Sequence, residues 1–258
     1  MFFDYVDRII LISIILLWAI SCVDIKEDRE NCPCRLEIVF SEDYLPAILS
    51  IKDSGLVLRV DTIIESGKYS MNVKKSLLKV NLCYSDYGMF DPEEGIKIEE
   101  GNECPPIYMS TKTYNTECMH ILDTAVLYKE YCGLNINFSR GSDDMVYPYK
   151  VVLRGNVCGY DLDLTPQEGK YSYSTLVDST GFCSIISPRQ IDNSLILDIV
   201  DEGGVVRSFT IGEYIGRSGY DWQAKNLKDI DLEIDLCNTE FTIWVDEWSD
   251  STSFELVI

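Results

Sequence analysis

The chain has 258 residues, 46% of them hydrophobic, which is enough for a real core in one large domain or two of ordinary size. A formal net charge of −21 disfavours nucleic acid as a partner, because its phosphates would be repelled. The single histidine, His120, argues against a histidine-based metal site or a Ser–His–Asp triad, and we expect it to be a structural or surface residue.

The first feature along the chain is an uncharged apolar run over residues 9–20. It is shorter than the ~20 residues that a membrane-spanning helix needs, and it favours a signal peptide over residues 1–21. Small residues then lead into Cys22, and Ala-Ile-Ser-Cys is similar to a bacterial lipobox, in which the cysteine receives a diacylglycerol. We expect lipid on Cys22; the alternative is ordinary secretory cleavage beside an incidental cysteine.

Residues 22–31 are rich in charge and are predicted to form a solvated, lipidated tether. Removing residues 1–21 takes away two acids and one base, which leaves 41 acidic and 21 basic residues and a net charge of −20. A field of this sign repels anionic headgroups as well as nucleic acid.

The ten cysteines follow no metal-binding pattern. Cys32 and Cys34 are closely spaced, but C-P-C lacks the two-residue gap and the second half of a zinc site. Nine cysteines remain after Cys22, which is an odd number. An exported chain permits disulfide bonds, so we expect some. Their pairing cannot be read from the sequence, and burial as small hydrophobic residues is an equally good interpretation of several.

Alternation of apolar and polar residues dominates the mature chain and predicts strands with one buried face. The clearest run covers residues 230–236 and is followed by a turn and a return strand over 241–245. A second hairpin is predicted between 195–200 and 205–211, because Gly203 and Gly204 supply the positive φ of a tight turn. Further alternating runs cover residues 36–40, 56–61, 78–84 and 134–138.

These strands, without long helical periodicity outside the signal peptide, predict an all-β fold of antiparallel β-sandwiches. Residues 85–117 are rich in turn formers and poorly patterned, and they separate two patterned blocks. We therefore expect an N-terminal β-sandwich domain over residues 32–123 and a C-terminal one over 124–258.

No set of residues that a reaction requires is present in the sequence. There is no G-x-S-x-G motif, no phosphate-binding glycine loop and one histidine to serve as a base. We expect no catalytic residue, cofactor, metal or small-molecule substrate. Two acidic pairs could coordinate Ca²⁺, but neither fills an EF-hand loop, and solvated turn acids are the favoured interpretation. These pairs are Asp161 with Asp163 and Asp143 with Asp144.

The C-terminal aromatic residues allow two interpretations. They could form a platform on which a glycan stacks, but in a β-sandwich such residues more often pack in the core or at an edge. The residues concerned are Tyr214, Tyr220, Trp222, Trp244 and Trp248.

Three stretches carry a family resemblance. The first joins Cys22 and the acidic linker to Asn31-Cys32-Pro33-Cys34-Arg35-Leu36-Glu37-Ile38; the second runs from residues 149–154 through 159–161 to 166–169. The third comprises Gly-Glu-Tyr-Ile at 212–215, 218–222 and 227–230, before the closing hairpin and Trp248. Together they resemble the FimB/Mfa-type fimbrillin-associated lipoproteins, which are anchor and accessory subunits of type V pili.

This resemblance implies a pair of transthyretin-like β-sandwich domains on the outer membrane, held by lipid on Cys22 and bound to fimbrial stalk subunits through β-strand exchange. Lipid at Cys22 would keep the first strand in place, so the tail 249–258 becomes the natural donor strand. Its candidate residues Phe254, Leu256 and Ile258 follow a polar linker over 249–253. The alternative is an ordinary last strand of the second domain.

Two other functions remain open at this point. One is a surface lipoprotein that binds glycans through Trp222, Trp244 and Trp248. The other is a tip or adhesin subunit of the same fimbria.

Overall fold

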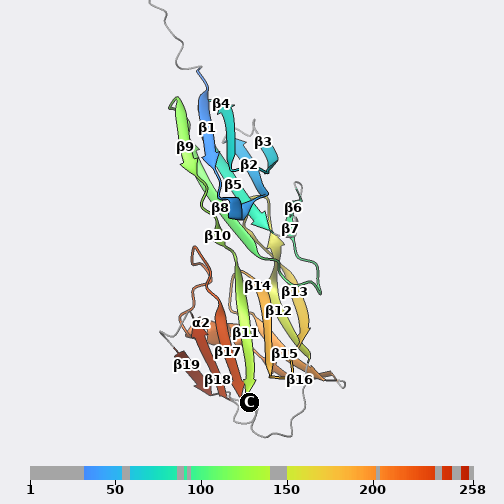
Figure 1. The fold of residues 1–258 in the computed structure, drawn as a ribbon. Helices are drawn as coiled ribbons and strands as arrows, with labels where there is room; N and C mark the ends of the chain where they lie inside the picture. Colours follow the sequence, from blue (N-terminus) through green and yellow to red (C-terminus); the bar gives the residue numbers. More distant parts are fainter. Residues whose placement is uncertain are drawn as a thin grey trace, which may run out of the picture.

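The computed structural model shows two blocks of β-strands stacked end to end in an elongated molecule (Figure 1). It describes residues 32–53, 59–85, 90–91, 94–139, 150–201, 204–235, 240–245 and 251–255. We call the two parts the N-terminal block and the C-terminal block. The all-β fold expected from alternation is confirmed.

The N-terminal block pairs a three-stranded sheet, in the order β4-β1-β9, with a five-stranded sheet, in the order β10-β8-β5-β2-β3. Buried residues from both sheets form one shared core, which includes Leu36 of β1, Leu49 of β2 and Val80 of β5. Each such fully buried side chain contributes about 1.5–3 kcal/mol. The elements are β1 (Cys34–Val39), the 3₁₀ turn η1 (Glu42–Tyr44), β2 (Ala47–Asp53), β3 (Arg59–Ile64), β4 (Lys68–Val73), β5 (Leu77–Ser85), β8 (Ile107–Asn115), β9 (His120–Thr124) and β10 (Tyr128–Lys129).

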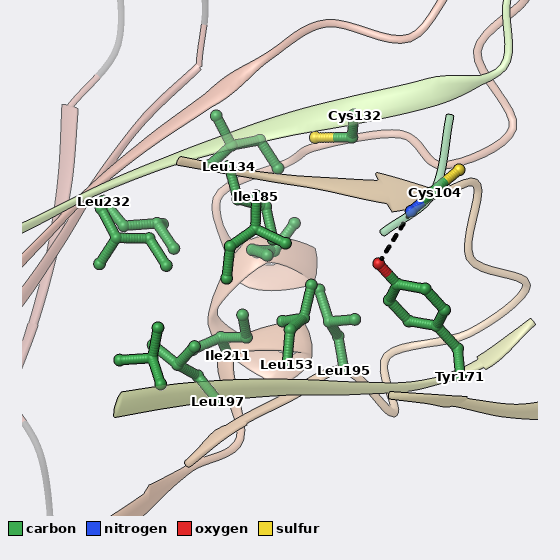
Figure 2. Packing of buried hydrophobic residues seen from close by; sticks show 14 of the residues in the cluster. Cys104, Cys132, Leu134, Leu153, Tyr171, Ile185, Leu195, Leu197, Ile211 and Leu232 are labelled. Atoms are coloured by element: carbon green, nitrogen blue, oxygen red, sulfur yellow. Dashed lines mark hydrogen bonds between the residues drawn. The ribbon is translucent and has the colours of Figure 1, made fainter. Parts of the chain in front are cut away.

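The C-terminal block pairs the sheet β14-β11-β17-β18-β19 with the sheet β16-β15-β12-β7-β6, and β13 adds to β12. Figure 2 shows Leu134 and Leu232 of the first sheet facing Leu153 of the second across the core. The elements are β6 (Phe90–Asp91), β7 (Gly95–Lys97), β11 (Tyr131–Ser139), β12 (Lys150–Tyr160), β13 (Pro166–Leu176), β14 (Phe182–Pro188), β15 (Ile196–Asp201), β16 (Gly204–Phe209), α2 (Ile211–Arg217), β17 (Ile230–Asp235), β18 (Glu240–Val245) and β19 (Ser251–Glu255).

The first strand of each block occupies the same position in its sheet. β1 lies between antiparallel β4 and parallel β9, and β11 lies between antiparallel β14 and parallel β17. Alternation predicted these strands but not their direction, so the two parallel pairs depart from the purely antiparallel sheets that we expected. The repeated arrangement supports two similar units; their division near residue 124 stays a prediction.

Two strands of the C-terminal block, β6 and β7, precede the last strands of the N-terminal block in the sequence. β7 lies between β5 and β8 in the sequence, yet it pairs with β12 (Figure 1). The approach is close: a Cβ on Gly95, whose φ is +90°, would lie 2.2 Å from the carbonyl oxygen of Tyr160. Glycine is therefore required at this position. The stretch 85–117, which we expected to be turn-rich, thus contains β6, β7 and β8.

Candidate binding surfaces

The first described strand, β1, is held on both edges and on both faces. Its inward residues Cys34, Leu36 and Ile38 are fully buried. On its outward face Glu37 forms ion pairs with Lys68 of β4 at 2.8 Å and, on its own strand, with Arg35 at 2.7 Å. The strand β1 is therefore fixed to its neighbour by side chains as well as by backbone hydrogen bonds.

His120, the single histidine, lies at the start of β9, half exposed, with Nε2 3.4 Å from Oε2 of Glu37. It is thus a surface residue, as expected. The hydrogen bond from Lys68 is the main cause that lowers the pKa of Glu37 to about 2, and Arg35 and His120 lower it further. Glu37 consequently stays ionised across the physiological range and connects β1 to both β4 and β9.

The last described strand, β19, pairs with β18 and ends its sheet, so Phe254 lies opposite Phe241. β19 begins at Ser251, which makes the polar linker expected over 249–253 too long; part of it is strand. Leu256 and Ile258, the other candidate donor residues, lie outside the described residues, as does Cys22. The donor-strand role of the tail 249–258 stays a prediction.

The two blocks are joined by the turn between β12 and β13. Asp161 of this turn accepts hydrogen bonds from the backbone of Asp163, at 2.8 Å, and of Thr165, at 2.9 Å. Asp163 then reaches Lys52 at 2.8 Å and Lys79 at 3.1 Å in the N-terminal block, and both lysines lower its pKa. The first acidic pair considered for Ca²⁺ is therefore used in a turn and an ion pair. Asp143 and Asp144 lie outside the described residues.

A cleft of about 640 Å³ opens beside this junction, between the two blocks. Lys112 of β8 and Lys225 of the C-terminal block line it, and Nζ of Lys225 lies 4.2 Å from the centre of the Tyr128 ring. Arg189 and Glu130 also contribute. The lining thus contains three cations and one acid, and two of the cations are paired, Arg189 with Glu130 and Lys112 with Asp123.

Arg189 connects three segments at one wall of the cleft. Its guanidinium pairs with Glu130, and it donates hydrogen bonds to the carbonyl oxygens of Trp222 and Ala224, the latter at 2.9 Å. Both side chains of the ion pair are largely buried, at 8% exposure for Arg189 and 17% for Glu130. Burial raises the pKa of Glu130, and Arg189 opposes this change.

Trp222 does not belong to a glycan-stacking platform. It is 6% exposed, and its ring meets the Tyr220 ring edge-on at 4.8 Å between centroids. The prediction that included Trp222 in a glycan surface is therefore wrong, and its alternative, core packing, is confirmed for this residue. The side chains of Trp244 and Trp248 lie outside the described part of the structure.

No disulfide bond joins the eight cysteines in the described ranges, so the disulfide bonds that we expected are not seen there. Five of them, Cys34, Cys83, Cys104, Cys132 and Cys183, are buried, and burial raises the pKa of each thiol. Cys34 and Cys118 lie with their sulfur atoms 3.9 Å apart. Over the described ranges, no three or more His, Cys, Asp or Glu side chains gather as a metal site would require. Nor does any described helix have the length and apolar character needed to cross a membrane.

Solved structures with the same fold are known. An adhesin candidate from Bacteroides ovatus has a TM-score of 0.61 at 14% identity, over 86% of this chain and 96% of that one. The fimbrial anchor protein Mfa2 from Porphyromonas gingivalis has a TM-score of 0.59 at 14% identity, over 84% and 98%. A candidate polysaccharide-binding protein from Bacteroides thetaiotaomicron has a TM-score of 0.60 at 13% identity, over 87% and 98%.

No protein-family model matches the sequence, and a search of curated proteins gives no match. At these identities the likeness concerns the fold. The resemblance that the three sequence stretches carried is thus confirmed at the level of structure: the chain has the β-sandwich fold found in a fimbrial anchor protein.

Proposed function

We propose that this protein is a non-catalytic anchor or accessory subunit of a fimbria, held on the outer membrane by lipid on Cys22. It would join fimbrial stalk subunits through β-strand exchange. The fold shared with Mfa2, a fimbrial anchor protein, supports this class and covers 84% of this chain and 98% of that one. The fold shared with an adhesin candidate is consistent with the same role.

The observation that carries the proposal is the way β1 is held. A subunit that hangs from the membrane by its N-terminus transmits every load into its first strand. β1 meets this demand, because it is paired on both sides, buried on its inner face and bound through Glu37 on its outer face. It is therefore poorly suited to leave its sheet and well suited to remain attached to a tether.

The other end of the chain supplies the candidate for exchange. Among the described strands β19 pairs with β18 alone and so forms the edge of its sheet, and an edge strand can offer backbone groups to a further strand. β17 and β18 precede β19 in this sheet and carry the fully buried side chains Leu232 and Ile243. If the tail 249–258 left its own sheet, we expect these two strands to keep the core of the C-terminal block closed, and the segment could pair with an open sheet of a stalk subunit.

Deletion of residues 249–258 tests the exchange. The shortened protein should keep its melting temperature within a few degrees and stay in the membrane fraction, while cells shed their fimbriae into the medium. A matched control replaces Ser251 and Thr252 with alanine, which keeps the length of the strand. A truncated protein that fails to fold would make the tail an ordinary last strand, and one that folds and still retains fimbriae would remove the donor role.

The position of the subunit along the fimbria distinguishes an anchor role from a tip role. Immunogold labelling should place the protein at the cell end of the fimbria. Labelling at the distal end would replace the anchor role with that of a tip or adhesin subunit. Capture of stalk subunits, rather than binding to a glycan array, separates the fimbrial role from the glycan-binding one.

A further inference from the structure

Two cysteines that are distant in the sequence lie together at the start of the first strand. Cys34 is the first residue of β1, Cys118 precedes β9, and their sulfur atoms are 3.9 Å apart. The neighbouring backbone fixes this approach, because Arg35 donates a hydrogen bond to the carbonyl oxygen of Met119 at 2.9 Å. Arg35 also pairs with His120 in the parallel ladder. The sheet itself thus holds the two thiols side by side.

The two thiols differ in their access to solvent. Cys34 is fully buried and Cys118 is exposed. Burial, together with the nearby Cys118, raises the pKa of Cys34 to about 11. An external oxidant would therefore reach Cys118 first, and Cys34 would react as the internal partner.

We propose that Cys34 and Cys118 form a disulfide bond in the exported protein. The Cys118 thiolate attacks the disulfide of a thiol–disulfide exchange oxidant and releases one oxidant thiol. The Cys34 thiolate then attacks the Cys118 sulfur and releases the second oxidant thiol. Two electrons pass to the oxidant and the two protons end on its thiols. The sulfur atoms need to approach by only about 2 Å to reach the bonded distance.

The bond would close a loop from residue 34 to residue 118, which restricts the unfolded chain. Its mechanical consequence rests on the proposed anchor function. A pull on the tether enters the folded protein at the start of β1, and the disulfide would pass this load directly to the start of β9. β1 could then not be drawn out from between β4 and β9 without breaking a covalent bond.

Peptide mapping of the exported protein under non-reducing conditions tests the bond. We expect a linked peptide pair containing Cys34 and Cys118. Counting the thiols that iodoacetamide labels after denaturation adds an independent readout. Cys118→Ser should label at one thiol more than the wild type, because Cys34 is set free, whereas the control Cys32→Ser should label at one fewer. Labelling of Cys118 in the wild type, or a link from Cys118 to Cys32, would overturn the proposal.

Measurements of melting temperature and of fimbrial retention distinguish the disulfide bond itself from its proposed mechanical role. A reducing agent should lower the melting temperature of the wild type to that of Cys118→Ser and leave this variant unchanged. If the bond forms and cells with Cys118→Ser shed no more fimbriae under shear than wild-type cells, the mechanical role is wrong while the bond stands. If Cys22→Ala releases neither protein nor fimbriae, the anchor function fails, and the mapping result is unaffected.

Discussion

Asp163, in the turn between β12 and β13, lies 2.8 Å from Nζ of Lys52 on β2 and so joins the C-terminal block to the N-terminal block. The backbone supports this contact, because Asn81 donates a hydrogen bond to the carbonyl oxygen of Leu162 at 3.1 Å. The hydroxyl groups of Tyr108 and Tyr131 form a further contact between the blocks at 2.9 Å. The junction is therefore polar at several points, and its ion pair is partly exposed.

Asp163→Asn should weaken the junction without unfolding either block. Because Asp163 is half exposed, the ion pair contributes little, about 0–1 kcal/mol, and the loss should shrink as salt is added. Urea unfolding at low and high ionic strength measures this difference. Glu100→Gln changes an equally negative, exposed residue elsewhere and serves as the control. A loss that is large and independent of salt would contradict an electrostatic junction.

Glu37→Gln should change how stability depends on pH. The folded pKa of Glu37 is about 2 and an unfolded glutamate has a pKa near 4.3, so between these values the unfolded chain binds more protons. The stabilisation by Glu37 is therefore complete above about pH 4.5 and is lost as the pH falls toward 2. We expect the wild type to unfold at higher urea than the variant at pH 6, with a gap that narrows steadily as the pH falls toward 2.

Glu65→Gln, on the exposed turn before β4, is the matched control for this measurement and should show no such closing gap. If the difference between wild type and Glu37→Gln stayed constant across the range, the ion pairs around Glu37 would not hold β1.

Arg189→Met should be the most destabilising of these changes. It leaves Glu130 buried without its cation, and breaking a buried pair in this way costs about 3–5 kcal/mol. The double variant Arg189→Met with Glu130→Gln should recover part of the loss, because the unpaired charge is removed. Chemical denaturation of the wild type, of Arg189→Met and Glu130→Gln alone, and of the double variant gives the coupling free energy. Simple additivity of the two single variants would show that the pair does not act as a unit.

Cys22→Ala should move the protein from the membrane fraction to the soluble one. The expectation rests on the apolar run followed by Ala-Ile-Ser-Cys. Metabolic labelling with an alkyne-bearing fatty acid checks the lipid directly and should be lost in the variant. Cys32→Ala, ten residues further on, should keep both the label and the membrane location. Continued membrane retention of Cys22→Ala would refute lipid anchoring.

Alternation predicted the strands that have one wet face. Ile230, Leu232 and Ile234 are fully buried on β17, and the return strand β18 pairs with it as expected. The hairpin expected around Gly203 and Gly204 is also present, with Asp201 opposite Gly204. In these strands the alternation of apolar and polar residues reflects which face is buried, so the sequence alone was sufficient to predict them.

Other elements leave no such pattern. β7 is three residues long and too short to alternate, and α2 covers only seven residues, although Ile211 and Ile215 are buried. The direction of β9 beside β1 depends on chain connections that period-two patterning does not encode. The pairing of Cys34 with Cys118 depends on this direction, and for that reason spacing alone could not reveal it.

The early position of β7 in the sequence has a consequence for folding. β7 precedes Gly159 and Tyr160, the residues of β12 with which it pairs, by roughly sixty residues, so in an exported chain it emerges before them, while β8 can already close on β5. Ile96 and Ile98 are buried in the folded protein, but they remain exposed to solvent until β12 is available. A fragment that ends at residue 123 would keep this segment without its partner. A chimera that combines the N-terminal half of one protein with the C-terminal half of a relative would therefore fold only if residues 90–98 come from the same protein as the C-terminal half.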